Sequence, residues 1–447
     1  MNQKSILIIC DLFPPAFGPR MGYLCKYLLF NGWKPVVLTE DVKEDTFAFL
    51  ATCLQENEVA VTRVRYYNQK GWRGKMEWVW TMIRDMLFGY KDNRMYREAI
   101  KIAKNQSFDR VLCSTYRTFP MRAAARFAHE KRLPLVVDLR DIIEQYTGYE
   151  FITHPLPKVA GIDKWIASVF RKRNLAIRNN ILRKATAVTT VSPWHVSILK
   201  IYNVNTHLIY NGYDPDLFYP SDRQTAQFYI TYTGRLLSTA MRDPDLLFKA
   251  VNRLSQEGVI DPDMFRIRWF VDEKSAKIIT REAAKYPHII PYMGYYGYIP
   301  ASEIPQTLHE SAILLLLTNK SSTHNPQNAM TMTTTTSHHD AITTPTQTGP
   351  QGVMTTKLFE SLAVGRPIMC VRGDEGCLEA VINQTRSGLS AHHTDEVYDF
   401  IKHHYLRWKA GLPYEDISDK NEIKKYSREA QAKEFIEVFE QAEIIAT

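Results

Sequence analysis

The chain has 447 residues, of which 45% are apolar and 23% charged, a composition typical of a soluble globular protein. This length exceeds what one hydrophobic core usually organises, so it predicts two domains. No apolar run approaches the roughly 20 residues that cross a bilayer. The formal charge of +8 favours anionic partners such as nucleotides, nucleic acid or an acidic membrane face, without choosing among them.

The amino terminus and the cysteines indicate the compartment. The first apolar run is short and is followed by Asp11 and a pair of prolines, which is not a secretory pattern, so we expect a cytoplasmic protein. The six cysteines form no C-x-x-C pair and no spacing that would chelate zinc. We therefore expect reduced thiols and no structural metal.

The N-terminal half alternates strands and helices. An Ile-rich run at 5–10 predicts a buried strand, and a helix is expected at 20–33 with a stop at Asn31-Gly32. A second strand follows at 34–40, and the same alternation returns between residues 110 and 141. Strand, helix and strand at this spacing form a βαβ unit, so this half is predicted to be doubly wound α/β.

A second set of elements begins after the Pro- and Asp-rich stretch 215–227. Its strands are expected at 228–234, 265–271, 313–318 and 366–371, and its helices at 243–258 and 354–365. An amphipathic helix with Ala430, Phe435 and Phe439 as candidate contacts ends the chain. We predict two Rossmann-like lobes, 1–220 and 221–425, and a C-terminal helix within 426–447 that packs back on the first lobe.

One segment breaks this pattern. Residues 321–348 are rich in Thr, Asn, Gln and Pro and have no apolar period, which favours disorder over a lid or binding loop. His338, His339 and Asp340 in this segment are a candidate metal site, but a loop without preformed geometry is a poor ligand set. No metal is therefore expected.

Candidate binding residues follow the predicted strands, because ligands of open α/β sheets bind outside the carboxyl ends of the strands. Gly18 and Arg20 precede the first helix, where an anion would be favoured, although a plain turn explains them equally well. The loop has no G-x-G-x-x-G, which counts against an NAD enzyme. Asp138, Arg140 and Asp141 end another strand, either as an Arg–Asp pair that holds the loop or, for Asp141 above all, as a catalytic group.

The second lobe carries two further candidate clusters. Gly234 and Arg235 end its first strand and Arg242 follows near a helix start, so the two guanidinium groups could clamp a diphosphate or be ordinary surface residues.

The other cluster begins at Gly349 and Gly352, which let the backbone approach a ligand, and Thr355 or Thr356 would cap the next helix. Lys357 and Glu360 share one face of that helix, where lysine suits phosphate and glutamate suits sugar hydroxyls, or the two form an ion pair.

Residues 71–94 mix Trp72, Trp78 and Trp80 with basic side chains. Such an amphipathic segment suits the surface of an anionic membrane, and packing of the Trp residues in the core is the alternative.

Six stretches together resemble one known family: "FPPAFGPRMGYLCKYL", "DLRD", "ATAVTTVSP", "IYNGYDPDLF", "TYTGRL" and "TTKLFESLAVGRPI". They are similar to the family-four retaining glycosyltransferases of the GT-B fold, especially bacterial enzymes of capsular and exopolysaccharide synthesis. The resemblance implies an α/β fold of two doubly wound Rossmann-like lobes that face a central cleft, with acceptor binding in the first lobe and donor binding in the second.

The resemblance also implies roles for residues of the second lobe. Arg235 matches the arginine that contacts the donor diphosphate, and Arg242 stands near a second basic position. Glu360 matches the second glutamate of an E-x7-E motif, which binds the ribose hydroxyls. The first glutamate would fall at Gly352, where backbone N–H groups of Gly352 and Val353 would serve instead.

The remaining roles concern Lys357 and the first lobe. Lys357 would add positive charge beside the phosphates. In the first loop, Arg20 follows Gly18 and Pro19 where many relatives have a Gly pair, so Arg20 would replace backbone contacts to a phosphate or to the acceptor. Asp141 would orient the acceptor.

The implied activity is metal-independent transfer of a hexosyl group from a nucleotide diphosphate sugar, with retention, to a glycan that is lipid-linked at the inner face of the cell membrane. No cofactor beyond the donor is expected. A GT-B nucleotide-sugar epimerase and a non-catalytic GT-B scaffold stay open as alternatives, the latter favoured by Gly352. Nucleic acid is not an expected partner because the basic residues are scattered and no recognition motif accompanies them.

Overall fold

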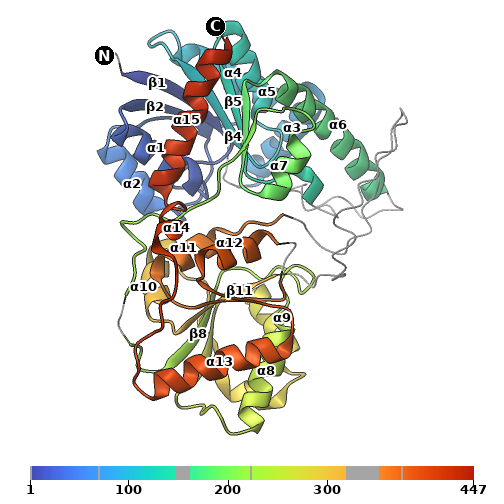
Figure 1. The fold of residues 1–447 in the computed structure, drawn as a ribbon. Helices are drawn as coiled ribbons and strands as arrows, with labels where there is room; N and C mark the ends of the chain where they lie inside the picture. The colour runs from blue at the N-terminus through green and yellow to red at the C-terminus, as the bar shows by residue number, and fades with distance from the viewer. Residues whose placement is uncertain are drawn as a thin grey trace, which may run out of the picture.

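The computed structural model describes residues 3–68, 71–145, 162–221, 224–318, 352–373 and 376–446. They form two lobes, each a parallel sheet with helices on its faces (Figure 1). The predicted fold class of two doubly wound α/β lobes is confirmed. The Thr-rich segment 321–348, including His338, His339 and Asp340, lies outside the described residues.

The first lobe has a sheet of strand order β3-β2-β1-β4-β5-β6-β7. Its strands are β1 (Lys4–Cys10), β2 (Trp33–Glu40), β3 (Ala60–Val64), β4 (Arg110–Thr115), β5 (Leu135–Leu139), β6 (Ala187–Thr190) and β7 (Thr206–Leu208). Its helices are α1 (Pro19–Phe30), α2 (Ala48–Glu56), α3 (Gly71–Phe88), α4 (Tyr90–Ile102), α5 (Met121–Lys131), α6 (Ile162–Lys184) and α7 (Pro193–Leu199). The central strand β1 is buried from Ser5 to Cys10, as its run of Ile and Leu predicts for a strand covered on both faces.

The second lobe has a sheet of strand order β10-β9-β8-β11-β12-β13. Its strands are β8 (Phe228–Thr233), β9 (Phe265–Phe270), β10 (Met293–Tyr295), β11 (Ile313–Leu317), β12 (Ile368–Val371) and β13 (Gly388–Ala391). The helices after β8 are α8 (Asp245–Gln256), α9 (Glu273–Ala283), α10 (Ile304–His309), α11 (Thr356–Val364), α12 (Cys377–Thr385), α13 (Thr394–Lys409), α14 (Lys420–Lys424) and α15 (Arg428–Ala446). The predicted lobe boundary at residue 220 falls in the connection from β7 to β8 and stays a prediction.

The last helix returns to the first lobe, as predicted. Helix α15 runs along α1 on the upper lobe of Figure 1. Phe435 and Phe439 are buried in the core cluster that contains β1 and α1 side chains, and the ring of Phe439 lies 5.5 Å from that of Trp33. The C-terminal helix therefore closes one face of the first sheet with apolar contacts.

Strand register brings distant loops to one edge of the first sheet. Cys10 of β1 pairs with Thr39 of β2 and with Ser114 of β4. Ser114 in turn pairs with Asp138 of β5. The loops after these strands consequently emerge together, where ligands of α/β sheets bind.

Candidate functional site

The second-lobe cluster forms at the carboxyl end of β8. Lys357 lies in the first turn of α11, and its Nζ is 3.3 Å from the hydroxyl of Tyr232 and 4.3 Å from the centre of that ring. Gly234 has φ +94°, and a Cβ at this position would lie 2.7 Å from Lys357 Nζ. Glycine is needed here because its backbone conformation and the lysine leave no space for a side chain. The structure thus brings Gly234 and Lys357 together.

Two arginines complete this cluster. The Arg242 guanidinium donates a hydrogen bond to the carbonyl of Arg235, and the Tyr232 hydroxyl donates to the same carbonyl at 2.9 Å. The side chain of Arg235 is 66% exposed, with its Nε 3.5 Å from the carboxylate of Asp272. The side chains of Arg242 and Lys357 therefore lie at one strand end, and that of Arg235, which starts from the same strand end, extends to Asp272 and is open to solvent.

Burial and neighbouring charges shift the pKa values of two side chains of α11, Lys357 and Glu360. Burial, together with the charge of Arg242, holds the pKa of Lys357 well below its usual value. Burial raises the pKa of Glu360 to about 7, against the opposing attraction of Arg428 and Lys357. An anion bound among these cations would favour the charged form of Lys357.

The turn before α11 contacts the first lobe. Gly352 is buried with φ +64°, and a Cβ there would lie 2.8 Å from the ring of Trp194 and 3.0 Å from Ser192 Oγ. Val353 beside it is half-buried. Thr355 is the N-cap residue as expected, but its side chain makes no capping hydrogen bond. A glutamate at 352 would need both a strained backbone and the displacement of Trp194.

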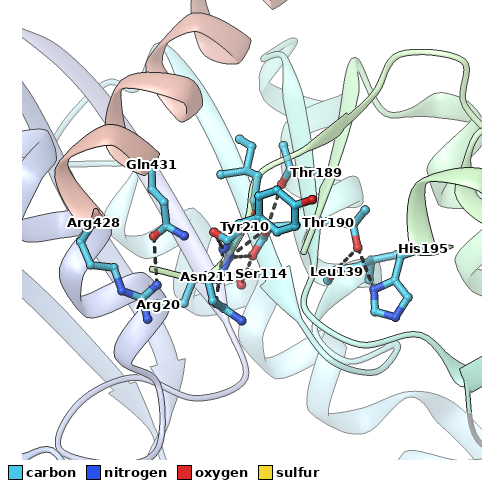
Figure 2. A network of polar contacts seen from close by, with 12 residues as sticks. Arg20, Ser114, Leu139, Thr189, Thr190, His195, Tyr210, Asn211, Arg428 and Gln431 are labelled. Atoms are coloured by element: carbon cyan, nitrogen blue, oxygen red, sulfur yellow. Dashed lines mark hydrogen bonds and ion pairs between the residues drawn. The ribbon is translucent and has the colours of Figure 1, made fainter. Parts of the chain in front are cut away.

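In the first lobe, Arg20 is fully engaged with the protein. Its guanidinium pairs with Asp138 at 2.9 Å and donates to the carbonyls of Ile209 and Tyr210 at 2.9 and 2.8 Å (Figure 2). Asp138 is completely buried and also accepts hydrogen bonds from the hydroxyls of two neighbours, Ser114 and Thr189. These contacts fit the alternative in which Asp138 holds the structure, although its partner is Arg20 and not Arg140. The predicted contact of Arg20 with a ligand stays a prediction.

Gly18 is the N-cap residue of α1. A Cβ at this position would lie 2.6 Å from the carbonyl oxygen of Leu12. The close approach of the two backbone segments therefore requires glycine, whatever its role toward a ligand.

The loop after β5 is held by two further interactions. Arg140 pairs with Asp11 at 2.5 Å, which anchors it to the end of β1. Asp141 accepts a hydrogen bond from the Gln145 amide at 2.9 Å, and Gln145 Oε1 is 2.8 Å from His195 Nε2. Burial raises the pKa of Asp141 above its ordinary value, and burial lowers that of His195 to about 4.

Sequence reasoning missed several of these partners. Asp11, Gln145, His195 and Tyr232 were not among the candidate residues, yet each contacts one of them or its loop. The position of Asp11 directly after the first strand was a usable signal. No sequence signal pairs His195 with Gln145, because 50 residues separate them.

The described residues contain no group of three or more His, Cys, Asp or Glu side chains placed to hold a metal ion. No helix among them combines the length and apolar character that crossing a membrane requires.

Comparisons with known proteins give structural neighbours only. No protein-family model matches the chain, and no curated protein matches it. Among solved structures, HepE of Anabaena in complex with UDP and glucose is similar with a TM-score of 0.57 at 12% identity, covering 98% of this chain and 100% of HepE. Sucrose-phosphate synthase of Thermosynechococcus elongatus is similar with a TM-score of 0.55 at 12% identity, covering 98% of each chain.

TarM is similar with a TM-score of 0.55 at 9% identity, covering 98% of this chain and 99% of TarM. These likenesses extend over whole chains at low identity. They show that the two lobes have the GT-B architecture.

Proposed function

We propose that this chain is a retaining glycosyltransferase, of the family-four type, that transfers a sugar from a nucleotide diphosphate sugar to a glycan acceptor. The observation that carries the proposal is the meeting of Gly234, Arg235, Arg242 and Lys357 at the end of β8. Cations around a glycine-lined strand end suit a diphosphate. HepE and TarM, which share the fold, were solved with UDP, so UDP sugars are the first donors to test.

The proposed reaction needs charge stabilisation more than covalent chemistry. The acceptor hydroxyl oxygen bonds to the anomeric carbon while the bond from that carbon to the phosphate oxygen breaks, and the nucleoside diphosphate keeps the electron pair. For retention, attack comes from the leaving-group face and a donor phosphate oxygen takes the acceptor proton. Arg235, Arg242 and Lys357 would stabilise the developing negative charge, so the proposal requires no metal.

We also propose roles for four further residues. Glu360, one turn further along α11, would accept hydrogen bonds from ribose hydroxyls, and the backbone of Gly352 and Val353 would contact the donor sugar. Asp141 would orient the acceptor across the interface of the lobes. The acceptor is proposed to be a lipid-linked glycan of surface polysaccharide synthesis, at the cytoplasmic face of the inner membrane.

The test is calorimetric titration with UDP. Arg235→Ala is expected to weaken binding by about 10- to 100-fold, the worth of one or two charge-assisted hydrogen bonds. The matched control is Arg281→Ala on α9, whose side chain is 72% exposed and pairs with its neighbour Glu282. The control should bind UDP as the parent does, and equal affinity of both variants would refute the assigned role.

Activity assays separate the alternatives. Release of UDP from a UDP sugar only when a glycan acceptor is present, with the anomeric configuration retained by NMR, supports the transferase. An epimer formed without free UDP would identify an epimerase. Failure of the parent protein to bind UDP, GDP, ADP, CMP or their sugars would favour the scaffold, which Gly352 in place of a glutamate already suggests.

A further inference from the structure

Helix α3 turns its apolar side to solvent. Its exposed apolar residues recur at intervals of three and four positions and are 37 to 71% exposed: Trp72, Met76, Val79, Trp80, Ile83, Met86 and Leu87. At about 3.6 residues per turn, these positions form one continuous stripe roughly 120° wide. We call these seven residues the α3 stripe.

The opposite side of α3 faces the protein with small or polar groups and one tryptophan. Gly74 and Thr81 are its buried residues, and Trp78 and Asp85 are half-buried on the same side. Thr81 Oγ1 donates to the carbonyl of Tyr66, and Asp85 accepts a hydrogen bond from the Lys91 backbone at 2.7 Å. A surface helix normally packs its apolar side on the core and exposes its polar side. The exposed stripe therefore indicates a binding surface for an apolar partner outside the described fold.

Basic residues border the stripe on both sides. Arg73 and Arg84 lie along one edge of it, and Lys75 lies along the other. Helix α6 adjoins the end of α3, because Arg173 donates a hydrogen bond to the carbonyl of Met86. Trp165 and Val169 of α6 are also exposed, at 68 and 45%.

Charge decides among apolar partners. Together α3 and α6 contain ten Lys or Arg and three Asp or Glu, a formal charge of +7; among the basic residues Arg178 is buried and paired with Glu144, and the excess positive charge is carried by the others. A second copy docked stripe to stripe would bring these like charges together. An anionic bilayer would instead accept the apolar side chains below its head groups and pair with the basic rims.

We propose that α3 is an interfacial helix that binds the surface of an anionic phospholipid bilayer through the α3 stripe. This deepens the proposed function, on which it rests for the membrane-linked acceptor. The docking also orients the first lobe. A pocket of about 620 Å³ opens at the N-terminal end of α3, lined among others by Asp41, Lys43, Tyr67, Trp72 and Lys75. It lies where β2 ends, so docking places this edge of the sheet beside the lipid head groups.

The test is co-sedimentation of the full chain with vesicles. Vesicles of phosphatidylglycerol and phosphatidylcholine should pellet the parent protein, and vesicles of phosphatidylcholine alone should pellet much less. The triple variant Trp72→Glu/Trp80→Glu/Leu87→Glu should bind the anionic vesicles at least tenfold more weakly. The matched control places the same charges on other exposed apolar residues, as Ile201→Glu/Val204→Glu/Ile417→Glu, and should bind like the parent.

A second variant tests the basic rims. Arg73→Gln/Lys75→Gln/Arg84→Gln keeps the stripe and should lose about fivefold in anionic-vesicle affinity for each basic residue removed. Equal pelleting of parent and stripe variant, or equal pelleting with both vesicle types, would overturn the proposal. So would a parent dimer in analytical ultracentrifugation that the stripe variant abolishes.

UDP titration of the same variants separates this inference from the proposed function. Stripe variants that lose vesicle binding and keep UDP affinity support membrane docking by α3. A parent protein that binds vesicles through α3 but binds no nucleotide would leave the docking intact and remove the transferase.

Discussion

Asp138 shows how one buried carboxylate can organise the first lobe. It is fully buried, yet it has four donor groups around it, supplied by Arg20, Ser114 and Thr189. Desolvation of a carboxylate is costly unless a cation and hydrogen bonds offset it. Because these residues come from α1, β4 and β6, the carboxylate ties the helix after β1 to the centre of the sheet.

Removing the arginine should therefore destabilise the fold. Arg20→Met leaves Asp138 as a buried charge without its cation, which should lower the free energy of unfolding by about 3–5 kcal/mol. Urea unfolding measures this loss. Arg65→Met is the control, since Arg65 is 66% exposed in its pair with Asp41 and should cost about 1 kcal/mol or less. A loss from Arg20→Met as small as that of the control would contradict the structural role.

Glu360 should make donor binding depend on pH. Its pKa is raised to about 7, mainly by burial, so its carboxylate is largely protonated at pH 6 and largely ionised at pH 8. If ribose hydroxyls donate to the ionised form, UDP affinity should rise about tenfold between these pH values. Lys357 acts in the opposite sense, because burial and the charge of Arg242 lower its pKa, and loss of its ammonium charge would weaken the attraction to a diphosphate.

Calorimetry from pH 5.5 to 9 would record this profile. Glu360→Gln should flatten the rising limb. A profile in Glu360→Gln that rises as steeply as in the parent would exclude Glu360 as the titrating group. Glu396→Gln on α13 is a control. Burial tends to raise the pKa of Glu396, but hydrogen bonds from backbone N–H groups outweigh burial and lower it, so the charge of Glu396 is constant over this range.

At the scale of elements, the turn before α11 couples the two lobes. Gly352 has a left-handed backbone, and its Cα faces Trp194 of α7. Gly352→Ala should destabilise the protein by about 1–3 kcal/mol through backbone strain and displacement of Trp194, and it should weaken UDP binding by shifting the start of α11. Differential scanning calorimetry measures the loss of stability, and UDP titration measures the loss of affinity.

A second glycine separates strain from collision. Gly376 is also left-handed, at φ +90°, but a Cβ there would meet no atom of the described residues within 4 Å. Gly376→Ala should thus cost only the backbone strain and leave UDP binding unchanged. If Gly352→Glu raised UDP-sugar turnover above that of the parent, the explanation for glycine at this position would be wrong.

Elements were predictable where the local pattern matches the tertiary environment. β1 and β11 are continuous apolar runs and are buried on both faces, and α1 ends at the predicted Asn31-Gly32. β3 was not predicted, because its residues are partly exposed at the sheet edge and its apolar alternation is weak. Composition alone did not decide whether the Trp residues of helix α3 pack in the core or face solvent. Trp72 and Trp80 are exposed, so the alternative of core packing is wrong for these two residues.

The candidate site was predictable as a set of strand-end loops but not as a set of contacts. Gly234 and Lys357 are 123 positions apart, and their meeting depends on where α11 starts relative to β8. The partner of Arg20 likewise depends on a register 118 residues distant. A local sequence pattern cannot identify such long-range pairs. The prediction therefore paired Asp138 with Arg140, the arginine nearest to it in sequence.

At the scale of the whole molecule, α15 places a positively charged side chain, that of Arg428, between the two lobes. Arg428 begins this helix and is 2% exposed, with its guanidinium 5.3 Å from the ring of Tyr23 in α1 and donating to Gln431 at 2.9 Å. Figure 2 shows Arg428 and Gln431 near Arg20 and its hydrogen-bond partners. Arg428 also attracts Glu360 of the second lobe and so lowers its pKa.

This arrangement predicts that a first-lobe contact tunes donor binding in the second lobe. Arg428→Gln removes a positive charge near Glu360, so the pKa of that carboxyl should rise above about 7 and the ascending limb of the UDP affinity profile should move to higher pH. At pH 7 the variant should bind UDP more weakly than the parent, whereas at pH 8.5 the two should converge because Glu360 is ionised in both.

Lys425→Gln provides the control, because Lys425 lies just before α15, is 62% exposed and pairs with Glu422. Its profile should coincide with that of the parent. A uniform loss of affinity at every pH in Arg428→Gln would indicate a disturbed lobe interface, and the absence of any shift would show that α15 serves only to cover the first sheet. A shift confined to the ascending limb would instead link the returning helix to the charge state of the donor site.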